Sequence, residues 1–429
     1  MDRLGGIKWV FQDGLTFQKA FVTTAHCCPS RASFLTGRYV HNHGIKRADN
    51  LGGGEAQFRS SGLDQSTVAT WLQNAGYDTM LIGKYLNGYT NTYRPPGWTE
   101  WYAEMGSVNM QGPILNENGT KVDYTADPRY YEDVLGDITV DFIERHAQAA
   151  GKPFFIFYNT HAPHHPFEPD AKYRGYFENV TMPRSPSFNE ADVSDKPKWV
   201  RDMPLHTAAQ IQQFSSIYKR RLEMMLSVRD NLNEIIAALQ RTGKLDNTYI
   251  FFTSDNGYHI GEHRLGNQKL TNYEEDIRVP LYVRGSGVPA GTRPQMVLNT
   301  DLAPTLAQIA EATPTSEVDG TSFVPLLNTT PPASWRKRFM AEAYQVNVPT
   351  PSGPKPYPMP ENRAVREQNS LYNKLSTGER EWYNLGLDPY ELNNRARYMS
   401  SELRSRQETL WRNLASCRGS GCKTAEFAP

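Results

Sequence analysis

Residues 153–158 decide the fold, because they form a short apolar run, Pro153-Phe154-Phe155-Ile156-Phe157-Tyr158, that leads directly into polar residues. Two other stretches have the same form, namely Tyr77 to Ile82 (YDTMLI) and Thr248 to Phe252 (TYIFF). Runs of this length, rich in aromatic and branched residues, predict buried strands. In open α/β sheets ligands bind beyond the carboxyl ends of such strands, so the polar residues that follow them are candidate site residues.

Helical patterns alternate with these strands. Ile211 to Arg241 carries apolar residues at helical spacing, and Gly243 follows as a stop signal. The pattern predicts a long scaffold helix that breaks near Ser227. Alternating strands and helices indicate an α/β layer architecture.

The chain of 429 residues is long enough for two or three domains. Two Pro-rich segments, at 325–332 and 349–360, separate a C-terminal portion with several aromatic residues from the rest of the chain. We therefore predict a domain boundary near residue 330, which gives a large domain at 1–330 and a smaller one at 331–429.

Composition excludes several classes of function. The 46 Lys and Arg residues balance 46 Asp and Glu residues, which disfavours sequence-independent binding of nucleic acid. The longest apolar run, 154–158, is far shorter than the roughly 20 residues of a membrane span. Residues 1–8 show no secretory signal. Three glycosylation sequons, at Asn118, Asn179 and Asn328, would matter only in a secreted chain.

The four cysteines form two pairs in the sequence. Cys417 and Cys422 lie five residues apart in a Gly-rich tail, a spacing that permits a small disulfide loop, and two free thiols are the alternative. Cys27 and Cys28 are adjacent, and neighbouring side chains serve one tetrahedral zinc site poorly.

Residues 27–38, with the sequence CCPSRASFLTGR, carry the most specific pattern in the chain. A cysteine two residues before Pro29 and four before Arg31, followed by Leu-Thr-Gly-Arg, resembles the signature of the sulfatase family. The resemblance implies that a formylglycine-generating enzyme oxidises Cys27 to formylglycine, whose hydrated aldehyde supplies the nucleophilic hydroxyl. Pro29 suits the first turn of a helix, whose N-terminus attracts an anion such as sulfate, and Arg31 lies one turn further on. A lone Cys27 would instead be interpreted as a buried thiol at a helix start.

Residues 83–87 (GKYLN) follow a predicted strand and resemble the lysine motif of the same family. The resemblance implies that the Lys84 ammonium holds a sulfate oxygen, whereas a lone lysine here would be a solvated residue. Many sulfatases have a histidine where this chain has Leu86. The Lys-Tyr-Leu-Asn variant resembles the branch of N-acetylglucosamine-6-sulfatases and extracellular heparan sulfatases.

Residues 161–166 (HAPHHP) resemble the histidine loop of the family, and the catalytic role falls to His164. Three histidines in five residues also suit a transition-metal cluster. However, the sequence places no paired cysteine or carboxylate at metal spacing nearby.

Residues 254–259 (SDNGYH) resemble the family's metal loop, which implies that Asp255 and Asn256 bind Ca²⁺ through oxygen atoms. Asp255 could also accept the proton of the nucleophile. Alone, Asp-Asn-Gly after a strand indicates a turn. Further on, residues 269–280 resemble the segment in which a lysine, here Lys269, contacts both the sulfate and the leaving oxygen.

One feature departs from the family pattern. The family's metal site also uses two adjacent aspartates at the end of a first strand, and no such pair precedes Cys27; Asp13 is isolated. We therefore expect an N-terminally incomplete catalytic domain, either a fragment of a working sulfatase or a form that keeps the fold without full activity.

The resemblance covers nearly the whole chain and implies an alkaline-phosphatase-like mixed sheet between helices, with a smaller C-terminal α+β domain. It implies a Ca²⁺-dependent hydrolase of sulfate esters, aryl or sugar, that is secreted or lysosomal in its full-length form. One alternative is a phosphonate or phosphate monoester hydrolase of the same superfamily, which would more often use Thr or Ser as nucleophile. The other is a truncated, non-catalytic protein that binds sulfated glycans.

Overall fold

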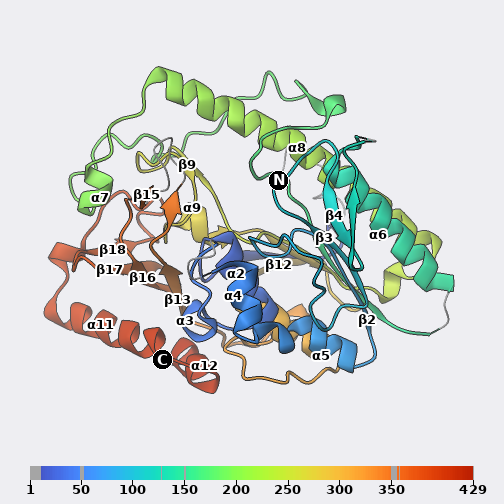
Figure 1. The fold of residues 1–429 in the computed structure, drawn as a ribbon. Coiled ribbons are helices and arrows are strands. Elements are labelled where there is room, and N and C mark those ends of the chain that lie inside the picture. The colour runs from blue at the N-terminus through green and yellow to red at the C-terminus, as the bar shows by residue number, and fades with distance from the viewer. Residues whose placement is uncertain are drawn as a thin grey trace.

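The computed structural model describes residues 11–48, 53–126, 128–148, 151–348, 355–356 and 358–428. The first eight residues and part of the Pro-rich segment 349–360 lie outside these ranges. Three main sheets and their helices make up the fold (Figure 1).

The first sheet contains two of the three strands that the sequence predicts. Its order is β5-β4-β3-β2-β6, with β2 parallel to β3 and β6 and the other neighbours antiparallel. The bounds are β2 (Asp78–Gly83), β3 (Glu100–Glu104), β4 (Ile114–Glu117), β5 (Thr120–Asp123) and β6 (Phe154–Asn159). The predicted strands at 77–82 and 153–158 are therefore confirmed to within a residue.

The second sheet has the order β10-β1-β11-β7, and β12 pairs in parallel with β1. Its strands are β1 (Leu15–Phe21), β7 (Ile250–Thr253), β10 (Arg278–Val279), β11 (Leu281–Arg284) and β12 (Gly291–Leu298). The predicted strand at 248–252 is β7, which begins two residues later than expected. Between the two sheets, β6 and β7 share one hydrophobic cluster, to which Phe154 and Phe252 both belong.

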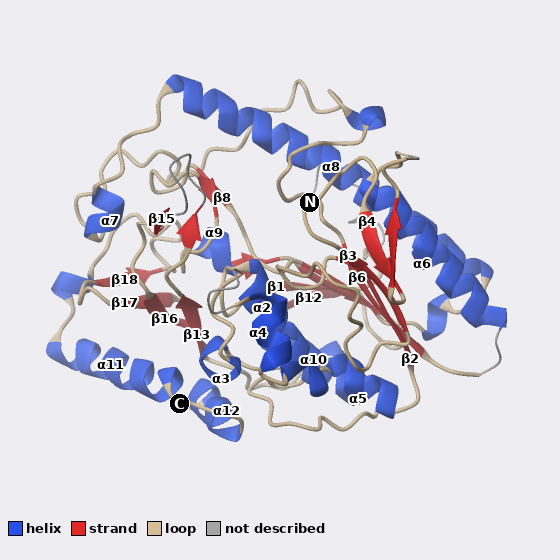
Figure 2. Cartoon of the chain, viewed as in Figure 1, coloured by secondary structure: helices blue, strands red, loops and turns tan. Residues whose placement is uncertain are grey.

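Strand β2 shows why helices cover both faces of the first sheet. Its Met80 and Ile82 pack with α6 (Tyr131–Gln148) and α8 (Ala208–Arg241), whereas Leu81 packs with α5 (Val68–Asn74). Successive side chains of a strand point to opposite faces, so the buried apolar run from Met80 to Ile82 requires a cover on each side. Figure 2 shows α6 and α8 on one side of these strands and α5 with α10 (Leu302–Ile309) on the other.

The long helix α8 is continuous from Ala208 to Arg241, so the expected break near Ser227 is wrong. Ser227 is buried, and its neighbours Leu226 and Val228 are buried as well. A serine in the middle of a helix can be accommodated when the surrounding helix is held by packing, because tertiary contacts override local propensity. No helix among the described residues is both long and apolar enough to span a membrane.

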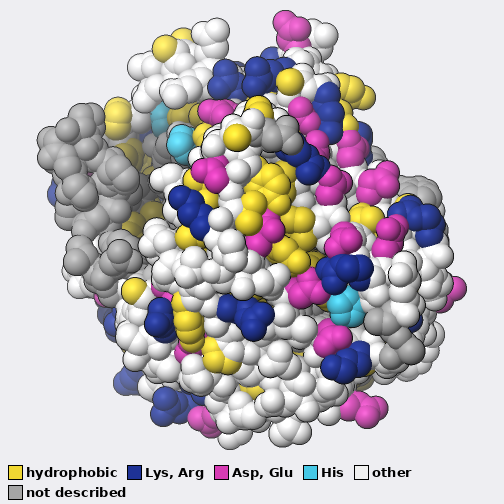
Figure 3. Space-filling model, turned by 45° about the vertical axis from the view of Figure 1, so that its right-hand side comes forward, with side chains coloured by type: hydrophobic (Ala, Val, Ile, Leu, Met, Phe, Trp, Pro, Cys, Tyr) yellow, Lys and Arg dark blue, Asp and Glu magenta, His cyan; other side chains and the backbone are white. Residues whose placement is uncertain are grey.

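The remaining helices are short or lie near the C-terminus. They are α2 (Cys27–Thr36), α3 (Val40–His43), α4 (Gly54–Ser60), α7 (Lys198–Arg201), α9 (Glu274–Ile277), α11 (Ser401–Ala415) and α12 (Ser420–Phe427). Charged side chains of both signs are interspersed over the face shown in Figure 3, which agrees with the balanced composition.

The C-terminal portion is built on a four-stranded antiparallel sheet that packs against the second sheet. Its strands, in spatial order, are β13 (Arg338–Ala343), β16 (Asn362–Glu367), β17 (Ser370–Leu375) and β18 (Arg380–Asn384). Phe21 of β1 and Phe339 of β13 have ring centroids 5.1 Å apart and belong to one hydrophobic cluster. The Cys417–Cys422 disulfide is present and joins the turn after α11 to α12, as the sequence allowed.

A buried ion network ties the C-terminal helix α12 to the residue that precedes α10. The guanidinium of Arg336 donates to Asp301 Oδ1 at 2.7 Å and to Glu426 Oε2 at 2.7 Å, and all three side chains are fully buried. Glu426 lies in α12, whereas Asp301 directly precedes α10. Two carboxylates and one guanidinium in the interior are stable only together, because each alone would be an unpaired buried charge.

We predict that Arg336→Met lowers the free energy of unfolding by about 3–5 kcal/mol, since it leaves Asp301 and Glu426 without their cation. Denaturant unfolding measures this change. Arg412→Met, on the exposed face of α11, is the matched control and should shift the value by less than about 0.5 kcal/mol. Equal effects of the two variants would contradict the importance of the buried network.

Candidate active site

Helix α2 places Cys27 and Arg31 on one side of the first turn. Cys27 is its first residue, follows the extended N-cap His26, and is 4% exposed. Its Sγ donates to Asn87 Oδ1 at 3.3 Å. The first turn of a helix has unpaired N–H groups and the positive end of the helix dipole, so this position favours a negatively charged sulfur or a bound anion.

The Arg31 guanidinium joins three segments of the chain. Its Nε donates to the Tyr85 carbonyl oxygen at 2.6 Å, its Nη2 donates to the Lys84 carbonyl, and its Nη1 pairs with Asp255 Oδ2 at 3.3 Å. It also lies over the Phe157 ring, 5.6 Å from the centroid. The carboxyl ends of β2, β6 and β7 therefore meet at this side chain, where the sequence predicts the site.

Lys269 and the loop after β7 complete the cluster. The Lys269 Nζ donates to Asn256 Oδ1 at 3.1 Å. The backbone N–H of Gly257 donates to the Asp276 carbonyl at 2.7 Å, and a Cβ on Gly257 would lie 2.1 Å from the Glu275 carbonyl oxygen. Glycine is thus required here by a close backbone approach, which makes this loop more than a simple turn.

The charges around Cys27 are mostly positive. Burial alone would raise the pKa of Asp255, but Lys84, Arg31 and Lys269 hold that pKa well below its usual range. Burial likewise opposes ionisation of Cys27, yet Lys269 and Lys84 bring its pKa below the usual value. The pKa of Cys28 is instead raised to about 12 by burial and by the neighbouring Cys27. Three cations facing one carboxylate form a site for an anion.

Two of the three histidines at 161–166 have different surroundings. His161 is buried, and both ring nitrogens are held, Nδ1 by Glu104 Oε2 at 3.2 Å and Nε2 by the His165 carbonyl at 2.8 Å. His161 therefore fixes the loop. His164 donates from Nδ1 to the same carbonyl at 2.8 Å, which leaves Nε2 for proton transfer. Burial and the charges of Lys84 and Lys269 lower the pKa of His164 well below its usual value.

The transition-metal alternative for this loop gains no support from the described residues. In that part of the chain, no group of three clustered metal-ligand side chains includes His161, His164 or His165. His161 also has no free ring nitrogen to offer.

Asp255 and Asn256 supply the hard oxygen ligands that Ca²⁺ prefers, so the donor type fits the expected cation. Among the described residues their oxygens contact Arg31 and Lys269, and no clustered group of three ligand side chains includes Asp255. Two protein ligands are fewer than the six to eight oxygens around calcium. Asp255 and Asn256 are therefore suitable calcium ligands, but two residues are too few to complete the coordination shell of the ion.

The structure brings together Cys27, Arg31, Lys84, Asp255, Asn256 and Lys269, and it places His164 within reach of both lysine charges. Their catalytic roles stay predictions. Sequence reasoning did not single out Asn87, although it lies in the quoted segment 83–87. It also missed His26, whose pKa falls to about 3 through burial and the charges of Lys269 and Lys84.

A pocket opens beside this cluster. It is lined by residues 84–89 together with Glu104 and Gly106. Lys84 and Asn87 belong both to the pocket and to the surroundings of Cys27, so a substrate held there would present its anionic group to the cations.

We predict that the unmodified Cys27 thiol reacts with iodoacetamide at lower pH than an ordinary cysteine. The lowered pKa increases the thiolate fraction, and thiolate is the reactive form. Lys84→Met should move the pH midpoint of Cys27 labelling upward, because one of the two lysine charges is removed. Peptide mass spectrometry over a pH series measures both effects.

Cys28 is the internal control in the same experiment. With a pKa near 12 and no exposed surface, it should stay unlabelled to at least pH 9. Labelling of Cys28 as fast as Cys27 would contradict the electrostatic difference between the two thiols.

The chain is similar to known proteins over most of its length. The family model described as Sulfatase matches residues 3–312, and that described as N-sulphoglucosamine sulphohydrolase, C-terminal, matches residues 261–420. An N-acetylglucosamine-6-sulfatase of Capra hircus is 34% identical over 450 residues, covering 96% of this chain and 79% of that protein. An arylsulfatase of Volvox carteri is 34% identical over 463 residues, covering 95% and 70%.

Solved structures show the same fold. One protein, determined in complex with its substrate D-glucosamine-2-N,6-O-disulfate, superimposes with a TM-score of 0.79 at 24% identity. The match covers 95% of this chain and 92% of that one. The expected α/β fold of the alkaline-phosphatase type, with a smaller C-terminal sheet region, is confirmed.

Proposed function

Because the chain belongs to the sulfatase family, whose members hydrolyse sulfate esters, we propose that it does so through a formylglycine formed from Cys27. The observation that carries the proposal is the position of Cys27 at the start of α2, facing Lys84 and Lys269. The relatives named for N-acetylglucosamine-6-sulfate and for aryl sulfates support a sulfated sugar or an aryl sulfate as substrate.

The cations position and stabilise the sulfate. Arg31 is fixed by two carbonyl oxygens and Asp255, so it presents its charge without a cost of reorientation. Lys84 and Lys269 approach from two other segments and hold the remaining sulfate oxygens. Negative charge grows on these oxygens in the transition state, where such contacts contribute most.

Two groups handle protons. Asp255 is ionised at neutral pH, and it or a neighbouring oxygen takes the proton of the attacking hydroxyl, which the hydrated aldehyde supplies when Cys27 carries the modification. His164 gives a proton from Nε2 to the leaving alcohol as its bond to sulfur breaks. Burial lowers the pKa of His164 most, with Lys84 and Lys269 adding to the effect, and the negative charge of a bound sulfate ester opposes the contribution of the two lysines.

Asp255 and Asn256 would hold a Ca²⁺ ion, which supplies further positive charge to the sulfate when bound. We propose that this site needs ligands beyond these two residues.

We infer that the formylglycine-generating enzyme acts before folding is complete, since Cys27 is 4% exposed in the folded chain.

We also propose a secreted or lysosomal location. The Cys417–Cys422 disulfide is typical of oxidising compartments, and Asn118, Asn179 and Asn328 are all exposed.

We predict that active preparations carry an aldehyde at Cys27 and that Cys27→Ala abolishes hydrolysis of aryl sulfates. Peptide mass spectrometry and turnover of 4-nitrophenyl sulfate measure the two results. Cys28→Ala is the matched control, because Cys28 packs in the core with its pKa near 12 and should affect stability more than turnover.

The same assay tests the alternatives. An intact thiol at Cys27 in fully active protein would overturn the mechanism. Faster hydrolysis of 4-nitrophenyl phosphate than of the sulfate would favour a phosphoesterase. Binding of a sulfated glycan without turnover, in protein shown to carry the aldehyde, would favour the non-catalytic alternative.

We predict that His164→Ala reduces turnover much more for a sugar sulfate than for 4-nitrophenyl sulfate. An alcohol with a high pKa needs a proton from the acid as it leaves, whereas 4-nitrophenolate leaves without one. The loss for the sugar ester should be about 10²–10⁴-fold, the usual contribution of a general acid. Equal losses for both esters would assign His164 a binding role.

A further inference from the structure

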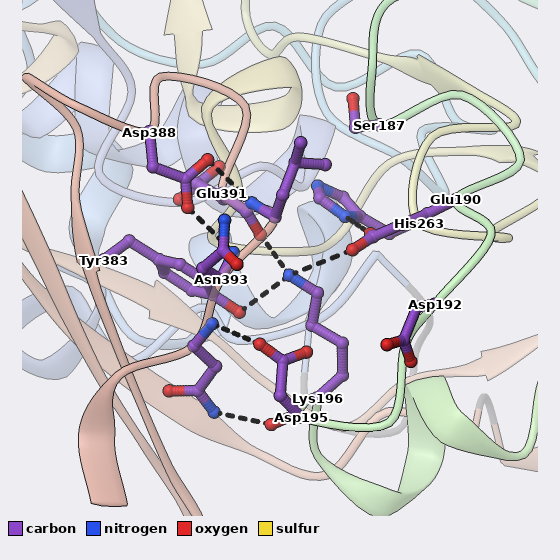
Figure 4. Close-up of polar contacts among 12 residues, drawn as sticks. Ser187, Glu190, Asp192, Asp195, Lys196, His263, Tyr383, Asp388, Glu391 and Asn393 are labelled. Carbon is purple, nitrogen blue, oxygen red and sulfur yellow. Dashed lines mark hydrogen bonds and ion pairs between the residues drawn. The ribbon is translucent and has the colours of Figure 1, made fainter. Parts of the chain in front are cut away.

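A second cluster of ligand-type side chains lies outside the candidate active site. His263 follows β8 (His259–Ile260), Glu275 lies in α9, and Glu391 follows β18 of the C-terminal portion. One ligand atom from each of the three lies within 4.8 Å of the others. His263 and Glu391 are 1% and 0% exposed, and the Oε2 atom of the half-buried Glu275 is also buried. Figure 4 shows His263 and Glu391 with the residues around them.

Each member of the cluster has one polar atom held by a partner. His263 Nδ1 donates to Glu190 Oε2 at 2.7 Å, and Ser187 Oγ donates to Glu275 Oε1 at 3.1 Å. Glu391 Oε2 accepts from the backbone N–H of Glu274 at 2.9 Å. These contacts fix the orientation of all three side chains.

The second polar atom of each member has no partner. His263 Nε2, Glu275 Oε2 and Glu391 Oε1 are all buried, and none makes a hydrogen bond. A buried polar atom without a partner destabilises the folded state, and more so if it is charged. Three such atoms from one cluster therefore point to a ligand that satisfies them together.

The nearby cation does not fill this need. Lys196 Nζ lies 3.7 Å from Glu190 Oε1 and 3.3 Å from the Tyr383 hydroxyl, and it donates to the backbone carbonyl of Glu391 (Figure 4). Within the described residues, no ion pair includes the side chain of Glu275 or Glu391. Two buried carboxylates thus face the imidazole without a positive charge of their own.

We propose that His263, Glu275 and Glu391 bind a divalent metal ion, with Zn²⁺ as the best match. One imidazole nitrogen and two carboxylate oxygens are common zinc ligands, and a water completes four-coordination. The Glu190 carboxylate, which holds the other ring nitrogen, fixes the tautomer that leaves Nε2 free for the metal. This site is separate from Asp255 and Asn256 and is not required for the proposed hydrolysis to be correct.

Such an ion would connect the C-terminal portion to the active site. Glu391 comes from the loop after β18, whereas Glu275 accepts a backbone hydrogen bond from Tyr258, two residues after Asn256. The metal would therefore hold the segment that includes Lys269 against the C-terminal sheet. Its role would be structural, and its loss would appear first in stability.

The competing explanation is a proton. Burial raises the pKa of both Glu275 and Glu391, so one of the carboxyl groups could be neutral and share its hydrogen with the other. The two explanations differ in what a glutamine does. The neutral amide of Glu391→Gln would replace a protonated carboxyl group at little cost, but it would remove a metal ligand.

The test uses the full chain, freed of metal by a chelator and then dialysed against Zn²⁺ or, separately, Ca²⁺. Bound metal is counted by mass spectrometry, and the melting temperature is measured with and without the ion. We expect the wild type to bind one zinc equivalent that His263→Gln and Glu391→Gln lose, together with the rise in melting temperature. Asp192→Asn, on the same surface loop as Glu190 and exposed, should keep both.

Each outcome decides the question. Equal zinc content in the wild type, His263→Gln and Glu391→Gln would overturn the proposal, and so would a Glu391→Gln variant that is as stable as the wild type in zinc. Retention of calcium in place of zinc would also contradict the stated ligand preference. Because Cys27 could bind zinc through its thiol, the counts are repeated in Cys27→Ala protein, where the difference between variants should persist.

Discussion

The ion pair and hydrogen bonds of Arg31 are the contacts on which the site depends. This one guanidinium holds the carbonyl oxygens after β2 and the Asp255 carboxylate after β7, while its helix carries Cys27. It is 6% exposed, so its charge is only partly balanced by solvent. With Lys84 and Lys269 close by, positive charge exceeds negative charge around the helix N-terminus. A bound anion relieves that imbalance, which explains why the site suits a sulfate ester better than a neutral substrate.

The cluster of cations also depends on how the sheets are covered. Helices cover both faces of the apolar part of β2. A charged residue such as Lys84 can therefore be placed only at the carboxyl end of the strand, where the chain leaves the core. The loop after β7 approaches α9 so closely that position 257 must be glycine. The long helix α8 supports this arrangement from the side opposite α5. Packing in the core thus determines where the charged residues can meet.

Local pattern predicted the strands, whereas the expected site residues came from the resemblance to the sulfatase family. The runs at 77–82 and 248–252 gave β2 and β7, because apolar composition identifies a buried strand. The break expected near Ser227 is absent, since packing against α6 overrides the local preference of a serine. The contact of Asn87 with Cys27 arises from the path of a loop. His263, Glu275 and Glu391 come from three segments with no regular spacing, so only the folded chain shows them as a cluster.

The C-terminal sheet and its helices are bound to the rest of the fold by buried charge as well as by apolar packing. Arg336 joins Asp301 to Glu426, and Lys196 joins Glu190 to the backbone of the Glu391 loop. Buried charges tolerate few alternative arrangements, because any displacement leaves one of them unpaired. Apolar contacts such as Phe21 with Phe339 would permit sliding, whereas the Arg336–Asp301 ion pair and the hydrogen bond from Lys196 to the Glu391 backbone fix one relative position. The segment from His263 to Asp276 lies between the C-terminal sheet and the rest of the fold, and it carries Lys269. The position of the Lys269 ammonium in the anion site therefore depends on how firmly these two parts are held together.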